Sequence, residues 1–296
     1  MAVISAYVQD RDNNLNLLRI LAAFGVLVSH AYPIALGPEA VQPLKAEIGI
    51  TLGHLSVYVF FVISGFLITQ SFDRSSSVGG WLAGRGLRLF PGLIVVVVLT
   101  ALLLGPAVTT LPLDAYFTDP EVPTYVLKNV TLAKLQFGLP GVFETNPYPA
   151  AINGSLWTLF HEVACYGFVF LLGVAGVIRS GRMMKGAMAA VVAALFVYQV
   201  TGLEAVTHPR LVAFFSLAFP FAIGMCAYAW RAAIPLNWAL GLPLVLLAWA
   251  ALDTPLFTFA FTLALAYWIF LLSFLPKGPI RAYNRIGDYS YGMYIY

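Results

Sequence analysis

Residues 15–36 read LNLLRILAAFGVLVSHAYPIAL, an apolar stretch that contains two ionisable side chains, Arg19 and His30. A stretch of about 20 predominantly apolar residues has the length of a membrane-spanning α-helix. The two ionisable residues are about three helical turns apart, so they lie on one face of the helix, about 16 Å apart along its axis. Because ionisable groups inside a span are energetically costly, this pair marks a candidate functional site.

The composition of the chain indicates that this span is one of many. Of the 296 residues, 60% are hydrophobic and only 10% are charged, and the mean hydropathy is +0.86. Soluble domains carry about 25% charged residues. The composition therefore predicts a polytopic protein embedded in a lipid bilayer. The net charge of +3 gives no indication of a nucleic-acid partner, and we expect none.

Apolar stretches recur along the chain at a spacing typical of membrane helices. Candidate spans cover 15–36, 48–70, 89–108, 156–178, 186–202, 211–230, 234–251 and 255–275, and a ninth begins near Ile286 and is cut off at Tyr296. Each span has to be helical, because lipid offers no hydrogen-bond partners to open backbone groups. We therefore expect an all-α fold of about eight complete transmembrane helices plus a truncated ninth, forming a single domain over 1–296.

The distribution of Lys and Arg between alternate loops predicts the orientation of the chain. With the amino terminus inside, twelve of them fall on the inner side, and four fall on the outer side, namely Lys45, Lys128, Lys134 and Arg210. Inner loops of membrane proteins are enriched in positive charge, so we expect the amino terminus inside. The long connection at about 109–154 then lies outside. Within it, residues 125–137 are expected to form either an amphipathic surface helix, with Lys128 and Lys134 facing water, or a plain connector.

A depth argument brings Glu162 to the level of His30. His30 lies about 9 Å below the outer end of its span, and Glu162 lies about 10 Å into the fourth span, which runs in the opposite direction. A carboxylate beside an imidazole sets its tautomer and raises its basicity, as general-base catalysis requires. The alternative for His30 is a simple hydrogen bond between helices. We interpret His54 and His161 as bystanders, since His161 points about 100° away from Glu162.

On the inner side, Arg85 and Arg88 are three residues apart and share a face where the third span begins. Guanidinium groups at a helix N-terminus suit phosphate binding. Ordinary anchoring at the inner membrane surface is the alternative, for this pair and for Arg19. In the second span, Ser64 and Gly65 lie among large apolar residues, where small residues permit close helix packing.

Several common catalytic motifs are missing from the sequence. There is no Walker, HExxH or GxSxG pattern, which argues against an ATP-driven pump, a zinc protease and a serine hydrolase. The two cysteines, Cys165 and Cys226, both fall within predicted spans and form no CxxC pair. We therefore expect no metal site.

Five motifs, in this order, resemble those of the acyltransferase-3 family of integral membrane O-acyltransferases, and they cover nearly the whole chain. They are Arg19 with His30 eleven residues later, FFVISGFL at 60–67, RGLR at 85–88, SLWTL at 155–159 reaching Glu162, and YSYGMY at 289–294. The chain departs from the family in two places. Asn16 stands where many members carry an acid, so an ion pair to Arg19 at that spacing is missing, and the last helix of the family usually continues further.

The resemblance implies an enzyme that moves an acyl group, usually acetyl, from acetyl-CoA at the inner face to a hydroxyl of an exported or surface glycan. It also implies an inner, cytoplasmic, bacterial membrane as the location. Catalytic roles fall to His30, Glu162 and Arg19, and donor-binding roles to Arg19, Arg85 and Arg88. In the mechanism that we hypothesise, the arginines hold the CoA phosphates, and His30 either removes the acceptor proton or carries the acetyl group briefly.

Other functions remain open from the sequence. A transporter or glycan-lipid flippase also keeps ionisable residues near the midplane of the membrane. An inactive relative that acts as an interaction partner is a third alternative, and a separate acyl-accepting partner is an alternative to direct transfer. Tyr32, Tyr148 and Trp157 near the outer mouth would stack on sugar rings or form an ordinary interfacial belt.

Overall fold

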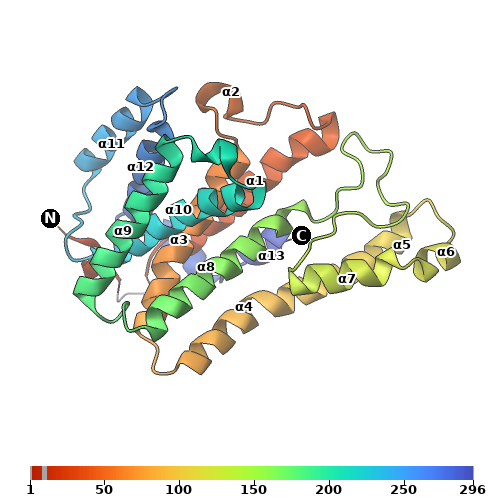
Figure 1. Cartoon of the computed structure of the whole chain (residues 1–296), viewed down its shortest axis with the longest axis horizontal. Coiled ribbons are helices and arrows are strands. Elements are labelled where there is room, and N and C mark those ends of the chain that lie inside the picture. Colours follow the sequence, from red (N-terminus) through yellow and green to blue (C-terminus); the bar gives the residue numbers. More distant parts are fainter. Residues whose placement is uncertain (1, 9–11, 296) are drawn as a thin grey trace. The chain divides into compact units, whose positions relative to one another are not determined.

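The computed structural model describes residues 2–8 and 12–295. Regular structure in this part of the chain is helical, apart from one isolated bridge between Val3 and Pro235 (Figure 1). Seven of the helices are long and apolar enough to cross a membrane. The predicted all-α, multi-pass membrane fold is confirmed.

The long helices follow the predicted spans in order. They are α1 (Leu15–Leu36), α3 (Leu52–Asp73), α4 (Val78–Leu99) with its continuation η2 (Thr100–Leu104) and α5 (Gly105–Val108), α8 (Trp157–Val174) preceded by η3 (Gly154–Leu156), α9 (Gly181–Val200), α10 (Pro209–Ala229) and α12 (Phe257–Phe274). The shorter elements are η1 (Ile4–Ala6), α2 (Lys45–Ile48), α6 (Leu113–Thr118), α7 (Glu121–Thr131), η4 (Leu203–Val206), α11 (Trp238–Ala250), η5 (Pro279–Arg285) and α13 (Ser290–Ile295).

The helix that corresponds to the third predicted span, 89–108, begins earlier in the sequence than predicted. Helix α4 starts at Val78, where the Ser77 side chain accepts a hydrogen bond from the backbone N–H of Gly80 and so caps the helix. The glycine-rich sequence at 79–86 has low helix propensity, yet it is helical throughout. Arg85 and Arg88 therefore lie about two and three turns inside the helix rather than at its beginning.

Two predicted spans near the carboxyl end are shorter than expected. Helix α11 has 13 residues, about 20 Å, whereas the hydrocarbon core is about 30 Å thick. Asn237 caps its first turn, which prevents the helix from starting at 234. The predicted ninth span is non-α until Ser290, because Gly287, with a φ of 114°, interrupts the chain after η5.

The chain forms two compact units, each built from separate stretches of sequence. The first unit comprises Met1–Ala22, His54–Ser75 and Ala164–Ser290, and the second comprises Ala23–Gly53, Ser76–Val163 and Tyr291–Tyr296.

In the first unit, helices α3 and α10 cross with their backbones in direct contact. A Cβ atom added at Gly65 would lie 2.0 Å from the carbonyl oxygen of Phe221, and one added at Gly224 would lie 2.1 Å from the carbonyl oxygen of Val62. No side chain fits at either position, so the crossing requires glycine on both helices. The predicted packing role of Gly65 is confirmed.

In the second unit, the loop after α5 is fastened to the π-helical turn η2. The Tyr116 hydroxyl donates to the carbonyl oxygen of Ala101 at 2.8 Å, and the Asn153 amide donates to the Thr100 hydroxyl at 3.0 Å and to the Tyr125 hydroxyl at 3.2 Å. Burial raises the pKa of Tyr125 to about 12. A π-helical turn displaces backbone carbonyls from their usual partners, and these side chains hydrogen-bond to that irregular segment.

The amphipathic helix predicted at 125–137 exists with different bounds. Helix α7 packs along α4 (Figure 1) and turns Val122, Tyr125 and Asn129 inward. It ends at Thr131, where the Asn129 side chain exchanges two hydrogen bonds with the backbone of Gln136. These bonds stabilise a non-helical return that hydrophobic periodicity alone does not reveal. Lys134 is exposed but lies outside the helix.

Candidate functional site

Arg19 lies in the first unit and is held by an acid from the far end of the chain. Its guanidinium forms an ion pair with Asp288 at 2.7 Å, and the two side chains are 10% and 19% exposed. The other carboxylate oxygen of Asp288 accepts from both the backbone N–H and the hydroxyl of Ser290. A buried ion pair is tolerated when further hydrogen bonds satisfy the acid, and Ser290 satisfies this condition.

The Arg19–Asp288 pair supplies the counter-charge that the sequence lacked at position 16. Asn16 instead donates to the Asn284 side chain at 2.7 Å. Sequence reasoning did not identify Asp288, which is 269 positions away from Arg19. The available signal was its place directly before the motif at 289–294.

His30, Arg85, Arg88 and Glu162 all belong to the second unit. The last residues of the chain connect two of the helices that carry them. The Tyr291 hydroxyl donates to the carbonyl oxygen of Leu89 on α4 at 2.7 Å, while the Tyr294 hydroxyl hydrogen-bonds to that of Thr158 on α8. A Cβ atom at Gly92 would lie 2.9 Å from the Tyr291 ring, so the ring needs glycine there.

The charges of Glu162 and Arg88 act on the same tyrosine. The Tyr291 hydroxyl lies within electrostatic range of both the Glu162 carboxylate and the Arg88 guanidinium, and the buried Tyr294 hydroxyl lies within range of Glu162. Glu162 is half-buried and Arg88 is exposed, so solvent screens part of the attraction between them. The structure therefore associates Glu162 with the side of α4 that carries Arg88 and with the two tyrosines of α13.

His30 is half-buried on the second half of α1. Among residues 2–8 and 12–295, no hydrogen bond or ion pair is made by its imidazole, although the neighbouring Ser29 hydroxyl is buried and bonds to the side chain of Gln42. No bond joins His30 to Glu162 in the described part of the chain, and their pairing stays a prediction.

The two other membrane histidines occupy local structural positions. The Nδ1 atom of His161 lies 3.0 Å from the carbonyl oxygen of Trp157, and the ring packs edge-on against Trp157 and Phe160. His54 is exposed and packs on the Tyr58 ring, with 4.6 Å between ring centroids. These contacts agree with the interpretation of both as bystanders.

Potential ligand-binding groups near the predicted outer side are mostly aromatic. Tyr32, Tyr148 and Trp157 are 39%, 41% and 36% exposed, which suits either sugar stacking or an interfacial belt. Within the described ranges, no group of three or more His, Cys, Asp or Glu side chains is arranged to hold a metal ion.

Comparison with known proteins identifies the family. A family model described as an acyltransferase domain matches residues 12–296. An O-acetyl transferase of Shigella phage Sf6 is 33% identical over 156 residues, which cover 53% of this chain and 44% of that protein. Nodulation protein 10 of Rhizobium leguminosarum bv. viciae is 35% identical over 163 residues, which cover 52% of this chain and 42% of that protein.

These alignments span less than half the length of the two curated relatives. No solved structure matches the chain. The family model, in contrast, covers nearly all of it and includes all five sequence motifs. The chain belongs to the acyltransferase-3 family of integral membrane acyltransferases.

Proposed function

We propose that this protein is a membrane O-acetyltransferase, which moves an acetyl group from cytoplasmic acetyl-CoA to a hydroxyl of a surface or exported carbohydrate in the bacterial inner membrane. One observation carries the proposal: the imidazole of His30, which has no hydrogen-bond partner within the described part of the chain, shares a compact unit with two arginines and a carboxylate. A base or nucleophile, cations for a phosphorylated donor and an acid are the groups that acyl transfer from acetyl-CoA needs.

Arg85 and Arg88 are the donor-binding residues in this proposal. They lie on one face of α4, three residues apart, and guanidinium groups bind phosphate oxygens through two parallel hydrogen bonds. Arg19, in the first unit, stays a proposed donor-binding and catalytic residue. Its ion pair with Asp288 already satisfies part of its charge, so we expect it to position other groups more than to bind phosphate itself.

His30 is proposed to act on the acceptor hydroxyl in one of two ways. As a general base it takes the hydroxyl proton while the oxygen attacks the thioester carbonyl, and CoA leaves as a thiolate that is then protonated. As a nucleophile it first attacks the thioester carbonyl, and CoA leaves as a thiolate; the acceptor oxygen then attacks the acetyl-imidazole, the C–N bond breaks, and the released imidazole takes up the hydroxyl proton.

Glu162 is proposed to stabilise the imidazolium that either route forms. This role requires the carboxylate and His30 to approach when substrates bind, and catalytic hydrogen bonds often tighten only at that stage. The final acceptor is proposed to be a glycan, reached directly or through a separate acyl-accepting partner.

Labelled acetyl-CoA tests this proposal. Purified protein, incubated with acetyl-labelled CoA and lipid-linked glycans from cell envelopes, is expected to move label into the glycan fraction. Arg85→Ala and Arg88→Ala are expected to raise KM for acetyl-CoA about tenfold or more, because each removes a bidentate phosphate contact. Arg182→Ala is the matched control, since it removes an exposed cation from the first turn of α9 in the first unit.

The same experiment separates the alternatives. Binding of acetyl-CoA without transfer of label indicates an inactive relative. Movement of unlabelled glycan lipid across vesicle membranes, with no label incorporated, indicates a flippase and contradicts the proposal.

A further inference from the structure

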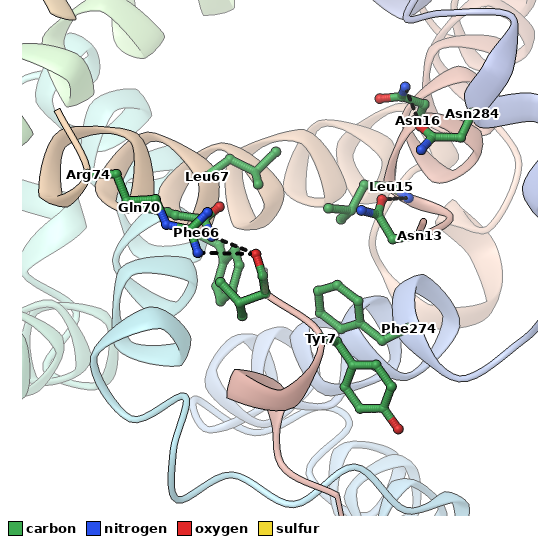
Figure 2. Close-up of a pocket in the computed structure, with 11 residues that line it drawn as sticks. Tyr7, Asn13, Leu15, Asn16, Phe66, Leu67, Gln70, Arg74, Phe274 and Asn284 are labelled. Atoms are coloured by element: carbon green, nitrogen blue, oxygen red, sulfur yellow. Dashed lines mark hydrogen bonds between the residues drawn. The ribbon is translucent and has the colours of Figure 1, made fainter. Parts of the chain in front are cut away.

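The first unit contains a pocket of about 460 Å³ that none of the proposed catalytic residues lines. Figure 2 shows its walls: the start of α1, the last two turns of α3, the end of α12, and the segment around Tyr7. Its volume lies in the usual range for small-molecule sites, about 300–1,000 Å³. Three helix ends thus converge on a space large enough for a ligand.

Aromatic rings form one side of this pocket. Tyr7 and Phe274 stack with their centroids 5.7 Å apart and their planes 14° apart. Phe66 lies against Phe274, with 6.5 Å between centroids. Figure 2 shows the Tyr7 and Phe274 rings side by side at one edge of the space. A flat ring system is the ligand shape that such a surface accepts best.

Amide side chains and one cation form the other side. Asn13, Asn16, Gln70 and Asn284 line the pocket together with Arg74. Gln70 and Arg74 follow Phe66 at steps of four residues, so they share its face of α3, and both donate to the carbonyl oxygen of Val8. An amide has two N–H donors and an acceptor oxygen, and a guanidinium has five donors, so one bond each to Val8 leaves capacity for a ligand.

The residues that line the pocket favour one chemical class of ligand. Amide side chains recognise the adenine edge through paired donor and acceptor groups, aromatic faces stack on bases, and a guanidinium binds phosphate. An acyl chain would offer no hydrogen-bonding group to these four amides, and covering polar groups with apolar surface is costly. Among the residues that the structure describes, none of those that line the pocket carries a carboxylate.

We propose that this pocket binds a purine nucleotide, namely the adenosine 3′-phosphate end of the acyl donor. The predicted orientation places the start of α1 and the ends of α3 and α12 on the cytoplasmic side, where nucleotides are available. The identification of the ligand as part of acyl-CoA rests on the proposed function, whereas the preference for a purine nucleotide rests on the pocket alone.

Photolabelling of the purified full chain tests the pocket without any assay of transfer. An 8-azido derivative of adenosine 3′,5′-bisphosphate, mapped by mass spectrometry, is expected to label peptides that contain residues 7, 66–74 or 274, and unlabelled adenosine 3′,5′-bisphosphate is expected to compete. Labelling only elsewhere in the chain, or labelling that the unlabelled compound does not reduce, overturns the proposal.

Two variants give a second test by different means. Leu67→Trp fills the pocket without removing a hydrogen bond, and Gln70→Leu removes one amide of similar size. Each is expected to weaken binding of adenosine 3′,5′-bisphosphate about tenfold or more. Leu21→Trp is the matched control, because Leu21 is 56% exposed and does not line the pocket. Unchanged affinity in both folded pocket variants overturns the proposal.

A truncated donor separates this inference from the proposed function. If the protein transfers acetyl, the pocket variants are expected to raise KM for acetyl-CoA about tenfold and leave KM for acetyl-pantetheine, which lacks the nucleotide, unchanged. An equal rise for both donors overturns the nucleotide assignment. Nucleotide labelling without transfer from either donor refutes the proposed function and leaves the pocket assignment standing.

Discussion

The contacts inside the first compact unit differ in kind from those inside the second. In the first unit, backbones meet at Gly65 and Gly224, and the buried ion pair of Arg19 with Asp288 is satisfied by Ser290. In the second unit, hydroxyl and amide groups hydrogen-bond to irregular backbone, and His30 has no bonding partner among the described residues. The two ionisable residues of α1 therefore differ: Arg19 in the first unit is held in an ion pair, whereas His30 in the second unit is available for chemistry in the proposed function.

The largest effect is expected on kcat, when each of the two ionisable residues of α1 is replaced in turn. His30→Gln is expected to lower kcat by a factor of about 10²–10⁴, which is the usual contribution of an acid–base group, without changing the thermal midpoint. Arg19→Gln is expected to lower the thermal midpoint because it leaves Asp288 buried without its counter-charge. Steady-state kinetics and unfolding scans in detergent measure both. A large loss of stability in His30→Gln would contradict the proposed difference between the units.

The next largest effect is expected on the free energy of unfolding, when the Arg19–Asp288 ion pair is disrupted. Removing one partner of a buried pair costs about 3–5 kcal/mol, so Arg19→Met and Asp288→Ala are each expected to be strongly destabilising. The double variant is expected to be less destabilised than the sum of the two, since neither charge is then left alone. A double-mutant cycle on thermal or denaturant unfolding measures this coupling. Strict additivity would show that the pair contributes nothing of its own.

The glycine crossing in the first unit gives a smaller effect. Gly65→Ala and Gly224→Ala each place a methyl group against a backbone carbonyl, and overpacking typically costs about 1–3 kcal/mol. Gly167→Ala is the matched control on α8, where an added Cβ meets nothing within 4 Å, and it is expected to leave stability unchanged or slightly increased. Equal effects at the three positions would refute the close crossing.

The smallest effect is expected at the outer loop of the second unit. Tyr116→Phe removes only the hydroxyl that donates to the carbonyl oxygen of Ala101. One intramolecular hydrogen bond contributes about 0.5–1.5 kcal/mol to stability, and the loop is expected to exchange its amide hydrogens faster. Hydrogen exchange of residues 109–154 is the readout, with Tyr148→Phe, an exposed site in the same loop, as the control.

The length of the apolar stretches predicted most of the fold, because a bilayer requires spanning segments to be helices of about that length. Helix α1 has the predicted bounds, and the packing role of Gly65 followed from its small size among large neighbours. The start of α4 was missed because its glycines suggest a loop, while the Ser77 cap and the surrounding structure make it helical. The π-helical turn at Thr100–Leu104 has no periodic signal, so its contacts with Tyr116 and Asn153 were not predictable.

The candidate site was predictable in its residue types more than in its contacts. Arg19 and His30 were identified from their cost inside a span, yet the partner of Arg19 lies 269 positions away, beyond the reach of any local pattern. Equal depth suggested that Glu162 meets His30. Depth constrains one coordinate only, so that pairing stays a prediction, and the hydroxyls of Tyr291 and Tyr294 are the groups found within electrostatic range of Glu162.

A single-turnover reaction tests the central claim, that His30 performs the chemistry of acetyl transfer, most directly. Wild-type protein and His30→Gln are each loaded with saturating labelled acetyl-CoA and mixed with glycan acceptor, and bound donor is quantified in parallel. Both proteins are expected to bind the donor equally well, and only the wild type is expected to transfer label within the time of one turnover. Transfer by the His30→Gln protein at the wild-type rate would contradict that claim.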